Sequence, residues 1–311
     1  MPCTGRFAPS PTGPLHFGSL LAALASYLDI RARNGRWLVR IEDIDPPREQ
    51  PGAADAILQT LDAFGLHWDG EVVYQSQRYT FYEEALQQLI RLDTAYRCRC
   101  SRKQLRTRGV LGYDGHCLQH PPEITTDVAW RLKHTQAEQQ FEDRIQGLRH
   151  YHWAGHEGDC VIYRRDGLFA YQLAVVVDDA EQGITEVLRG SDLIDETPHQ
   201  MELQDQLGYR RPRYAHIPVI TNREGQKLSK QNLAPAIDAR QRQTLLLQAL
   251  KLLGQQPANE LADASLEELL LWGCQHWRLE AVPAVLQLAP DGTPLGAPVL
   301  DNIQPDGSAP R

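Results

Sequence analysis

The 311-residue sequence lacks several features that define whole classes of protein. It has no apolar run approaching the roughly 20 residues of a membrane-spanning helix, and no charged-then-apolar leader at its start. We therefore expect a cytoplasmic protein that makes no contact with a membrane. Internal repeats are also missing, and the formal net charge is -8. An acidic balance argues against broad, nonspecific binding of nucleic acid but leaves room for local basic patches.

Cysteine is scarce, and its six copies are unevenly distributed. Cys98, Cys100 and Cys117 form a cluster, whereas the other three lie far apart. In a reducing compartment this pattern favours a metal site over disulfides. Three thiolates suit tetrahedral zinc, and a fourth ligand must complete a structural site. Zinc chemistry favours His116 or His120 for that ligand. The alternative is three reduced thiols in a small core.

The glycine-rich Walker loop that commonly holds phosphate is missing as well. Another phosphate site is indicated where a predicted strand, Cys3 to Ala8, is followed by three prolines and a glycine. These residues stop the strand and prevent an immediate helix. From Gly18 the apolar spacing is that of a buried helix face, so His16 and Ser19 lie at a helix start that favours anions. The alternative is a proline-rich connection with a surface histidine.

Predicted strands and helices alternate in a way that is typical of parallel βαβ units. In the first half, a strand over 37–41 ends at the carboxylates of Glu42 and Asp43, and helices follow over 53–64 and 79–92. Carboxylates at such a strand end lie where open α/β sheets bind ligands. The alternative for Glu42 is a solvated strand end.

The alternation of predicted strands and helices resumes later in the chain. We predict a helix over 168–178, a strand over 184–188, a helix over 191–207 and a final strand over 216–220. Between the two halves, residues 97–108 carry six positive charges and no acid. This break in the pattern fits a small inserted subdomain that includes hairpins.

These shifts divide the chain into five predicted segments. Residues 1–95 and 166–235 form the two halves of one α/β domain, and 96–165 form the inserted subdomain with the candidate zinc site. Residues 236–287 form a small helical domain. Residues 288–311, rich in proline, glycine and aspartate, are predicted to be a flexible tail.

A second basic motif, KLSKQ from Lys227 to Gln231, follows the last predicted strand. Alone it would be a solvated turn, but together with His16–Ser19 it resembles the two signatures of the class I aminoacyl-tRNA synthetases. The run from Arg6 to Gly13 resembles the glutamyl branch of that family. The resemblance covers about residues 3–235 and implies a doubly wound, Rossmann-like parallel sheet of the α/β class. It also implies an inserted zinc-binding subdomain and a small C-terminal helical domain.

The activity that the resemblance implies is ATP-dependent activation of L-glutamate, with ATP and Mg²⁺ in the site. A carboxylate attacks the α-phosphorus and pyrophosphate leaves, so positioning and charge stabilisation do most of the catalysis. The implied catalytic residues are His16, Ser19, Lys227 and Lys230. The implied ATP-binding residues are His16, Gly18 and Lys230. The implied glutamate-binding residues are Arg6, Phe7, Ala8, Pro9, Ser10, Glu42, Tyr171 and Arg189.

Physical chemistry agrees with these assignments. A fixed guanidinium such as Arg6 or Arg189 can hold a carboxylate in a two-pronged pair, and Glu42 suits the α-ammonium. The alternative for Arg189 is an ion pair with Glu186 or Asp192.

The sequence departs from the family pattern at two positions. Ser19 occupies the place of the second histidine of the first signature, and Gln231 replaces the terminal serine of the second. Neither change removes a charge that the chemistry needs. For the zinc site, the resemblance implies Tyr113 as the fourth ligand of one structural Zn²⁺ per chain.

About 75 residues follow residue 235, which we expect to be too few for an anticodon-binding domain. The combination resembles truncated members of the glutamyl branch, which attach glutamate to the queuosine base in the anticodon loop of tRNA(Asp). The expected partners are L-glutamate, ATP and queuosine-bearing tRNA(Asp), and we expect a monomer. One alternative is a truncated glutamyl-tRNA synthetase that charges a tRNA 3′ end. Another is a non-catalytic paralogue that binds tRNA or glutamate.

Overall fold

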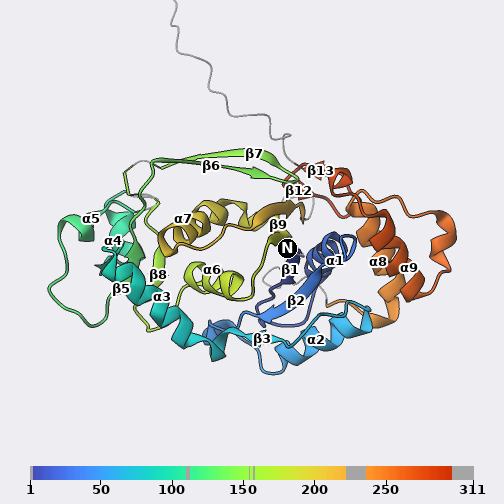
Figure 1. Ribbon diagram of the computed structural model, residues 1–311, viewed down its shortest axis with the longest axis horizontal. Coiled ribbons are helices and arrows are strands. Elements are labelled where there is room, and N and C mark those ends of the chain that lie inside the picture. Colours follow the sequence, from blue (N-terminus) through green and yellow to red (C-terminus); the bar gives the residue numbers. More distant parts are fainter. Residues whose placement is uncertain (1–2, 110–112, 154, 157, 222–235, 296–311) are drawn as a thin grey trace, which may run out of the picture.

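The computed structural model describes residues 3–109, 113–153, 155–156, 158–221 and 236–295. At its centre lies a five-stranded sheet (Figure 1). Its strands are β1 (Thr4–Phe7), β2 (Arg36–Ile41), β3 (Val73–Tyr74), β9 (Glu186–Gly190) and β10 (Arg213–Ile217). Their order is β10-β9-β1-β2-β3, and every neighbouring pair is parallel. The prediction of a doubly wound parallel sheet is confirmed. β1 lies between β9 and β2, so the switch point that binds ligands in such sheets is at its carboxyl end.

Other elements pack against both faces of this sheet and bury them. Successive side chains of a strand point to opposite faces, so each strand contributes to both sides. Trp37, Val39 and Ile41 of β2 pack on one face, in a core shared with four helices. These helices are α1 (Phe17–Arg31), α2 (Ala53–Ala63), α8 (Arg242–Leu252) and α9 (Leu266–His276). Leu38 of β2 packs on the other face, with Val187 of β9 and residues of a hairpin.

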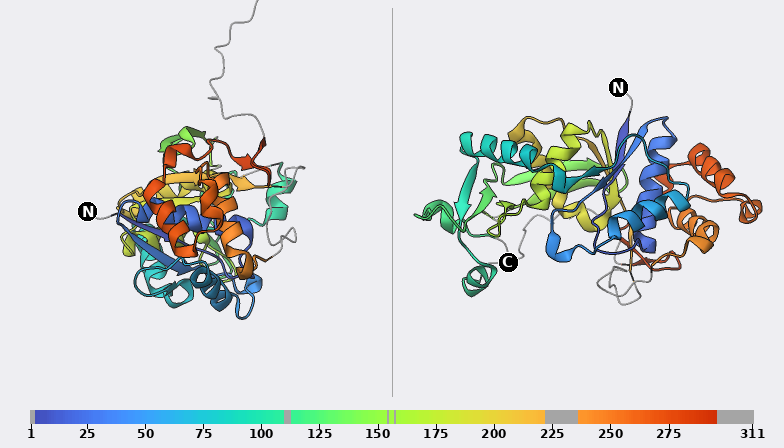
Figure 2. Two further views of the ribbon diagram at one scale, coloured as in Figure 1. Left: turned by 90° about the vertical axis from the view of Figure 1, so that its right-hand side faces the viewer. Right: turned by 90° about the horizontal axis from the view of Figure 1, so that it is seen from below.

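A second group of helices lies on the other side of the molecule from α8 and α9 (Figures 1 and 2). It comprises α3 (Tyr79–Arg91), α6 (Tyr171–Glu181) and α7 (Thr197–Leu207), which share a core with the inserted segment. The helix predicted over 168–178 is α6, which begins and ends three residues later than predicted. The helix predicted from Ser191 is wrong in its first six residues, because Ser191–Glu196 form a 3₁₀ helix. Pro198, which lacks an N–H group, is tolerated only in the first turn of α7.

The strands of the second half also differ from the prediction in their bounds. β9 begins two residues later than expected, because α6 extends to Glu181 and the chain then turns at Gly183, where φ is +63°. The strand predicted over 216–220 divides at Pro218, which cannot donate a ladder hydrogen bond. Residues up to Ile217 belong to β10, and β11 (Val219–Ile220) joins a separate small sheet.

The small sheet contains residues that we predicted to be a flexible tail. β11 pairs with β12 (Gln287–Leu288), which pairs with β13 (Pro294–Leu295). The prediction is therefore wrong for residues 288–295, because Leu288 is buried in the main core. None of the helices in the described part of the chain combines the length and apolar character needed to cross a bilayer.

The inserted segment contains two antiparallel units. One is a three-stranded sheet of β4 (Ala95–Cys98), β5 (Ala129–Leu132) and β8 (Val161–Tyr163), with α4 (Arg102–Thr107) and α5 (His116–Gln119) beside it. The other is the hairpin of β6 (Glu138–Asp143) and β7 (Gly147–His152). This hairpin runs back along the molecule toward β12 (Figure 1) and contacts β10. The insertion therefore reaches the central sheet.

Candidate active site

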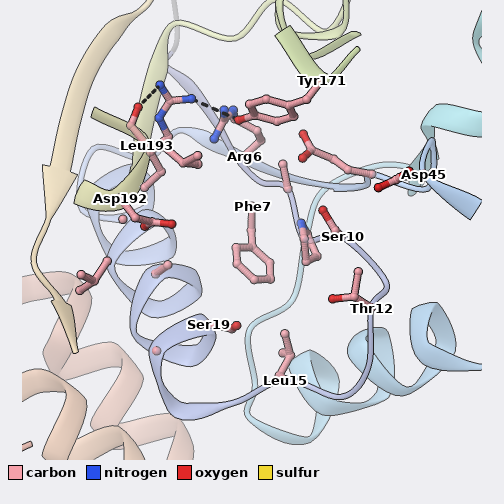
Figure 3. Close-up of a pocket in the computed structure, with 18 of the residues that line it drawn as sticks. Arg6, Phe7, Ser10, Thr12, Leu15, Ser19, Asp45, Tyr171, Asp192 and Leu193 are labelled. Carbon is pink, nitrogen blue, oxygen red and sulfur yellow. Dashed lines mark hydrogen bonds between the residues drawn. The ribbon is translucent and has the colours of Figure 1, made fainter. Parts of the chain in front are cut away.

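A cavity of about 710 Å³ opens where β1, β2 and β9 end (Figure 3). It brings together every predicted catalytic, ATP-binding or glutamate-binding residue in the described part of the chain. Its lining includes Arg6, Phe7, Ala8, Pro9, Ser10, His16, Gly18, Ser19, Glu42, Tyr171 and Arg189. Lys227 and Lys230 lie outside the described residues, so their roles stay predictions.

The start of α1 forms one wall of this cavity. His16 is the N-cap residue, and its Nδ1 accepts a hydrogen bond from the Ser19 N–H group at 3.2 Å. Its Nε2 lies 3.1 Å from Ser19 Oγ. Since Nδ1 accepts, Nε2 carries the proton and donates to the hydroxyl, which leaves the hydroxyl proton of Ser19 directed elsewhere. Backbone N–H groups of a first helical turn and such a hydroxyl together favour an anion.

Arg6 extends from β1 and is held by a carboxylate of α6. Its Nε donates to Asp179 Oδ1 at 3.1 Å, and Nη1 of the buried Arg40 lies 2.8 Å from the same oxygen. Burial alone would raise the pKa of Asp179, but the charges of Arg6 and Arg40 outweigh it and lower the pKa. One ionised carboxylate therefore fixes two guanidinium groups beneath the cavity.

Glu42 follows β2 and is buried, so it is not the solvated strand end that the sequence left open. Its Oε1 lies 3.5 Å from Arg40 Nη2, yet this oxygen accepts no hydrogen bond from any described residue. Burial raises the pKa of Glu42 to about 7, against the opposing charges of Arg40 and Arg6. A buried carboxylate oxygen without a donor favours a cationic partner such as an ammonium group.

Arg189, at the end of β9, is held by four neighbours. Its Nη1 donates to the Tyr171 hydroxyl at 3.4 Å, and its Nη2 donates to the Leu193 carbonyl at 3.2 Å (Figure 3). Nη2 also donates to Thr197 Oγ1 at 2.9 Å, and Nε donates to His216 Nε2 at 3.0 Å. All four acceptors are uncharged.

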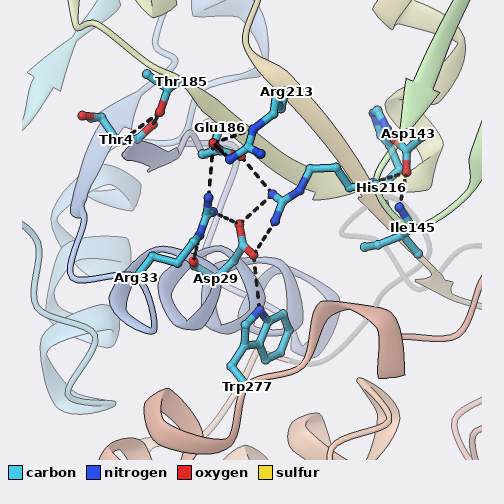
Figure 4. Close-up of polar contacts among 11 residues, drawn as sticks. Thr4, Asp29, Arg33, Asp143, Ile145, Thr185, Glu186, Arg213, His216 and Trp277 are labelled. Atoms are coloured by element: carbon cyan, nitrogen blue, oxygen red, sulfur yellow. Dashed lines mark hydrogen bonds and ion pairs between the residues drawn. The ribbon is translucent and has the colours of Figure 1, made fainter. Parts of the chain in front are cut away.

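The ion pair between Arg189 and Glu186 that the sequence left open does not form. Residues three apart on a strand point to opposite faces. Glu186 instead lies among Arg33, Arg144 and Arg213, together with Asp29 (Figure 4). This charged group joins the starts of β9 and β10 to the end of α1, away from the cavity.

Sequence reasoning missed Arg40, Asp178 and Asp179. Asp178 accepts hydrogen bonds from Gln75 and Tyr82, each at 2.8 Å, and from Arg78. A signal was present, because three valines are followed by two adjacent acids at the end of the helix predicted over 168–178. Buried carboxylates require cationic or hydrogen-bonding partners. The sequence therefore indicates that buried carboxylates have polar partners, but it does not identify which residues these partners are.

The cysteine cluster lies at the other end of the molecule from α8 and α9 (Figure 1). The thiol sulfurs of Cys98, Cys100 and Cys117 all lie within 4.8 Å of one another, and in the described part of the chain no histidine joins this group. The hydroxyl of the buried Tyr113 lies 3.6 Å from Cys98 Sγ and accepts a hydrogen bond from the Cys117 N–H group at 2.9 Å. Three thiols this close together can supply three of the four ligands of a tetrahedral metal ion.

Comparison with known proteins identifies the family. Residues 3–269 match the model of the catalytic domain of class I tRNA synthetases (E and Q). The glutamyl-Q tRNA(Asp) synthetase of Pseudomonas aeruginosa is 52% identical over 280 residues, which cover 90% of this chain and 94% of that protein. The proteins of the same name from Thiobacillus denitrificans and Vibrio cholerae are 54% and 49% identical, covering 90% and 92% of this chain and 95% and 94% of theirs.

Solved structures agree with this assignment. The fold is similar to a glutamate tRNA ligase of Elizabethkingia meningosepticum in complex with its amino acid, with a TM-score of 0.77 and 25% identity. The glutamate-tRNA synthetase of Elizabethkingia anophelis gives the same two values. Both matches cover 92% of this chain, which spans 66% and 67% of those longer proteins. The chain belongs to the class I tRNA synthetases of the E and Q group and, within that group, to the family of the glutamyl-Q tRNA(Asp) synthetases.

Proposed function

We propose that this protein activates L-glutamate with ATP and transfers it to the queuosine base in the anticodon loop of tRNA(Asp). The observation that carries the first step is the cavity, which surrounds one space with two guanidinium groups, a buried carboxylate and the start of α1. These groups match a dicarboxylic amino acid and a phosphate chain. The acceptor is inferred from the names of relatives that are about half identical over nine tenths of the chain.

In the proposed mechanism the protein positions reactants and stabilises charge, and it provides no nucleophile. Arg189 and Arg6 hold a carboxylate, and Glu42 holds the α-ammonium of glutamate. The other carboxylate of the bound glutamate attacks the α-phosphorus of ATP, the bond to pyrophosphate breaks, and glutamyl-adenylate forms. The start of α1 with Ser19 holds phosphate oxygens, and Lys227 and Lys230 neutralise the charge that grows on pyrophosphate. Mg²⁺ bound to ATP would share that neutralisation.

Transfer to tRNA tests the whole proposal. Labelled glutamate should become attached to tRNA(Asp) that contains queuosine and not to the same tRNA without it, because only queuosine offers the cyclopentene-diol hydroxyl. The measurement is acid-precipitable label with both tRNAs and ATP. Equal labelling of the two would contradict the proposed acceptor. No exchange of pyrophosphate into ATP with glutamate, with or without tRNA, would indicate a non-catalytic paralogue.

The raised pKa of Glu42 gives this proposal a pH signature. Below a pKa of about 7 the free protein carries a proton on Glu42, and an ammonium pairs only with the ionised carboxylate. Binding must then release that proton. The glutamate association constant should therefore rise about tenfold per pH unit below the pKa and level off above it. Calorimetry across this range measures the profile. Glu42→Gln should bind weakly with a flat profile, and a flat profile in the unmodified protein would contradict the role of Glu42.

We further propose that Cys98, Cys100, Cys117 and Tyr113 hold one structural Zn²⁺. When bound, the ion would tie β4 to the turn before α5. Gly115 supports this turn, because its φ of +70° and the His156 ring, 2.0 Å from where a Cβ would lie, exclude larger residues. The cytoplasmic location and the monomeric state stay predictions.

Cys98→Ser should release the metal and destabilise the inserted segment, because the remaining thiolates lose the charge that holds them together. Metal analysis should find about one zinc per chain in the unmodified protein and almost none in the variant. Cys274→Ser, in α9 and outside the cluster, is the matched control and should keep the metal. Tyr113→Phe with unaltered zinc affinity would reject the tyrosine as a ligand, and a zinc-free unmodified protein would reject the site.

A further inference from the structure

Behind Arg189 lies a buried pair of residues that the mechanism above does not use. His216 on β10 and Asp143 at the end of β6 are both almost completely buried. The Nδ1 atom of His216 lies 2.6 Å from Asp143 Oδ2, and its Nε2 lies 3.0 Å from Arg189 Nε. The three side chains therefore form a chain, Asp143–His216–Arg189, that ends at the cavity. Figure 4 shows the Asp143 and His216 end of it.

The partners on both sides fix the tautomer of the imidazole. An ionised carboxylate only accepts, so the proton of His216 lies on Nδ1. The Nε of arginine only donates, so Nε2 must present its lone pair. Burial and the nearby charge of Arg189 lower the pKa of His216 to about 4, which keeps the ring neutral at physiological pH. Asp143 is held ionised, because its hydrogen bonds with His216 and with backbone N–H groups outweigh the effect of burial on its pKa.

The tip of the β6–β7 hairpin locks this pair in place. Asp143 Oδ1 accepts hydrogen bonds from the N–H groups of Ile145, Gln146 and His216, at 3.0, 2.8 and 3.1 Å. The Gln146 amide donates to the His216 carbonyl at 2.8 Å. The segment inserted in the catalytic domain therefore supplies the carboxylate that orients a residue of the central sheet.

The two guanidinium groups of the cavity consequently differ in charge balance. Arg6 forms an ion pair with the carboxylate of Asp179, which it shares with Arg40. Among the described residues Arg189 forms no ion pair, since its acceptors are an imidazole, two hydroxyls and a carbonyl. A neutral acceptor aligns a guanidinium without neutralising it, whereas a carboxylate in that position would compete with a substrate carboxylate.

We propose that His216, oriented by Asp143, is a positioning residue that aligns Arg189 while leaving its positive charge for a substrate carboxylate. This inference rests on the proposed glutamate-activating function and assigns His216 and Asp143 to it. Neither residue touches the substrate. Their effect is on glutamate affinity through Arg189.

Two substitutions of His216 separate its contact with Arg189 from its contact with Asp143. The amide oxygen of His216→Gln can reach the Nε2 position and accept from Arg189, whereas the shorter amide of His216→Asn reaches only the Nδ1 position and Asp143. His216→Asn should weaken glutamate binding about tenfold to a hundredfold, the effect of losing one hydrogen bond to a charged group. His216→Gln should restore most of that affinity. In both variants the KM for ATP should stay within about threefold of the unmodified value. The readouts are calorimetry with glutamate and the KM values of ATP–pyrophosphate exchange.

The tautomer offers a test that requires no variant to fold. Nitrogen-15 NMR of the unmodified protein at neutral pH should find His216 protonated at Nδ1 alone. An imidazolium, or a proton on Nε2, would overturn the inference, as would equal loss of glutamate affinity in the two variants or an equal rise in the KM for ATP. If the unmodified protein neither binds glutamate nor supports exchange, the proposed function fails, and the role of His216 in binding a substrate carboxylate fails with it. If the unmodified protein is active and the variants behave alike, only the inference fails.

Discussion

Lys230→Ala should lower the rate of glutamate-dependent ATP–pyrophosphate exchange by about two to three orders of magnitude. The ammonium of Lys230 is proposed to neutralise charge that develops on pyrophosphate in the transition state. Its loss should therefore reduce kcat far more than it changes the KM for glutamate. The measurement is steady-state exchange over a range of glutamate and ATP concentrations.

Stability and surface charge provide the controls for this experiment. The unfolding temperature should be nearly unchanged, since the charge of Lys230 is proposed to act mainly in the transition state. Lys251→Ala removes an equal charge from an exposed position on α8, and its exchange rate should equal that of the unmodified protein. A Lys230→Ala variant with near-normal exchange would remove the lysine motif from the active site.

A tRNA(Asp) whose terminal ribose lacks its 2′,3′-diol, but whose queuosine is intact, should accept glutamate as well as the unblocked tRNA. Cleaving the remaining vicinal diol of queuosine with periodate should then abolish acceptance. A stem-loop that carries queuosine at the wobble position should suffice as substrate. The yield of labelled glutamate on each RNA measures the effect, which we expect to be nearly all or none. Binding should weaken steeply with salt, as contacts to phosphate require.

The blocked tRNA also decides between the two catalytic alternatives. If it accepts no glutamate, attachment is at the 3′ end and the truncated glutamyl-tRNA synthetase explanation is correct. The structure narrows the choice of phosphate contacts. Arg211 and Arg213, which have the charge for such contacts, are ion-paired with Asp205 and Glu186. The cations of 97–108, around the cysteine cluster, are the better candidates for mutagenesis, except Arg108, which pairs with Asp114.

The parallel sheet was predictable because its signals are local. Apolar strands alternate with amphipathic helices, and these elements end near prolines and glycines such as Pro9 and Gly13. Boundaries failed where a proline divided a continuous apolar pattern, as at Pro218, or where a helix changed type before Pro198. The return of the β6–β7 hairpin to β10 was not predictable, because alternating residues show that one face is buried but not what buries it.

Some features of the candidate site were likewise predictable from the sequence, and others were not. The sequence by itself determined which residues lie at strand ends and at the helix start. Arg6, Glu42 and Arg189 lie near the ends of recognisable strands, and His16 precedes a recognisable helix. Only the tertiary structure decided how these residues are charged and aligned. Asp179 reaches Arg6 across 173 positions, and Asp143 reaches His216 across 73. The physical reason is that a buried charge is set by whichever partners the packing of distant elements brings within hydrogen-bond distance, and no local pattern records those partners.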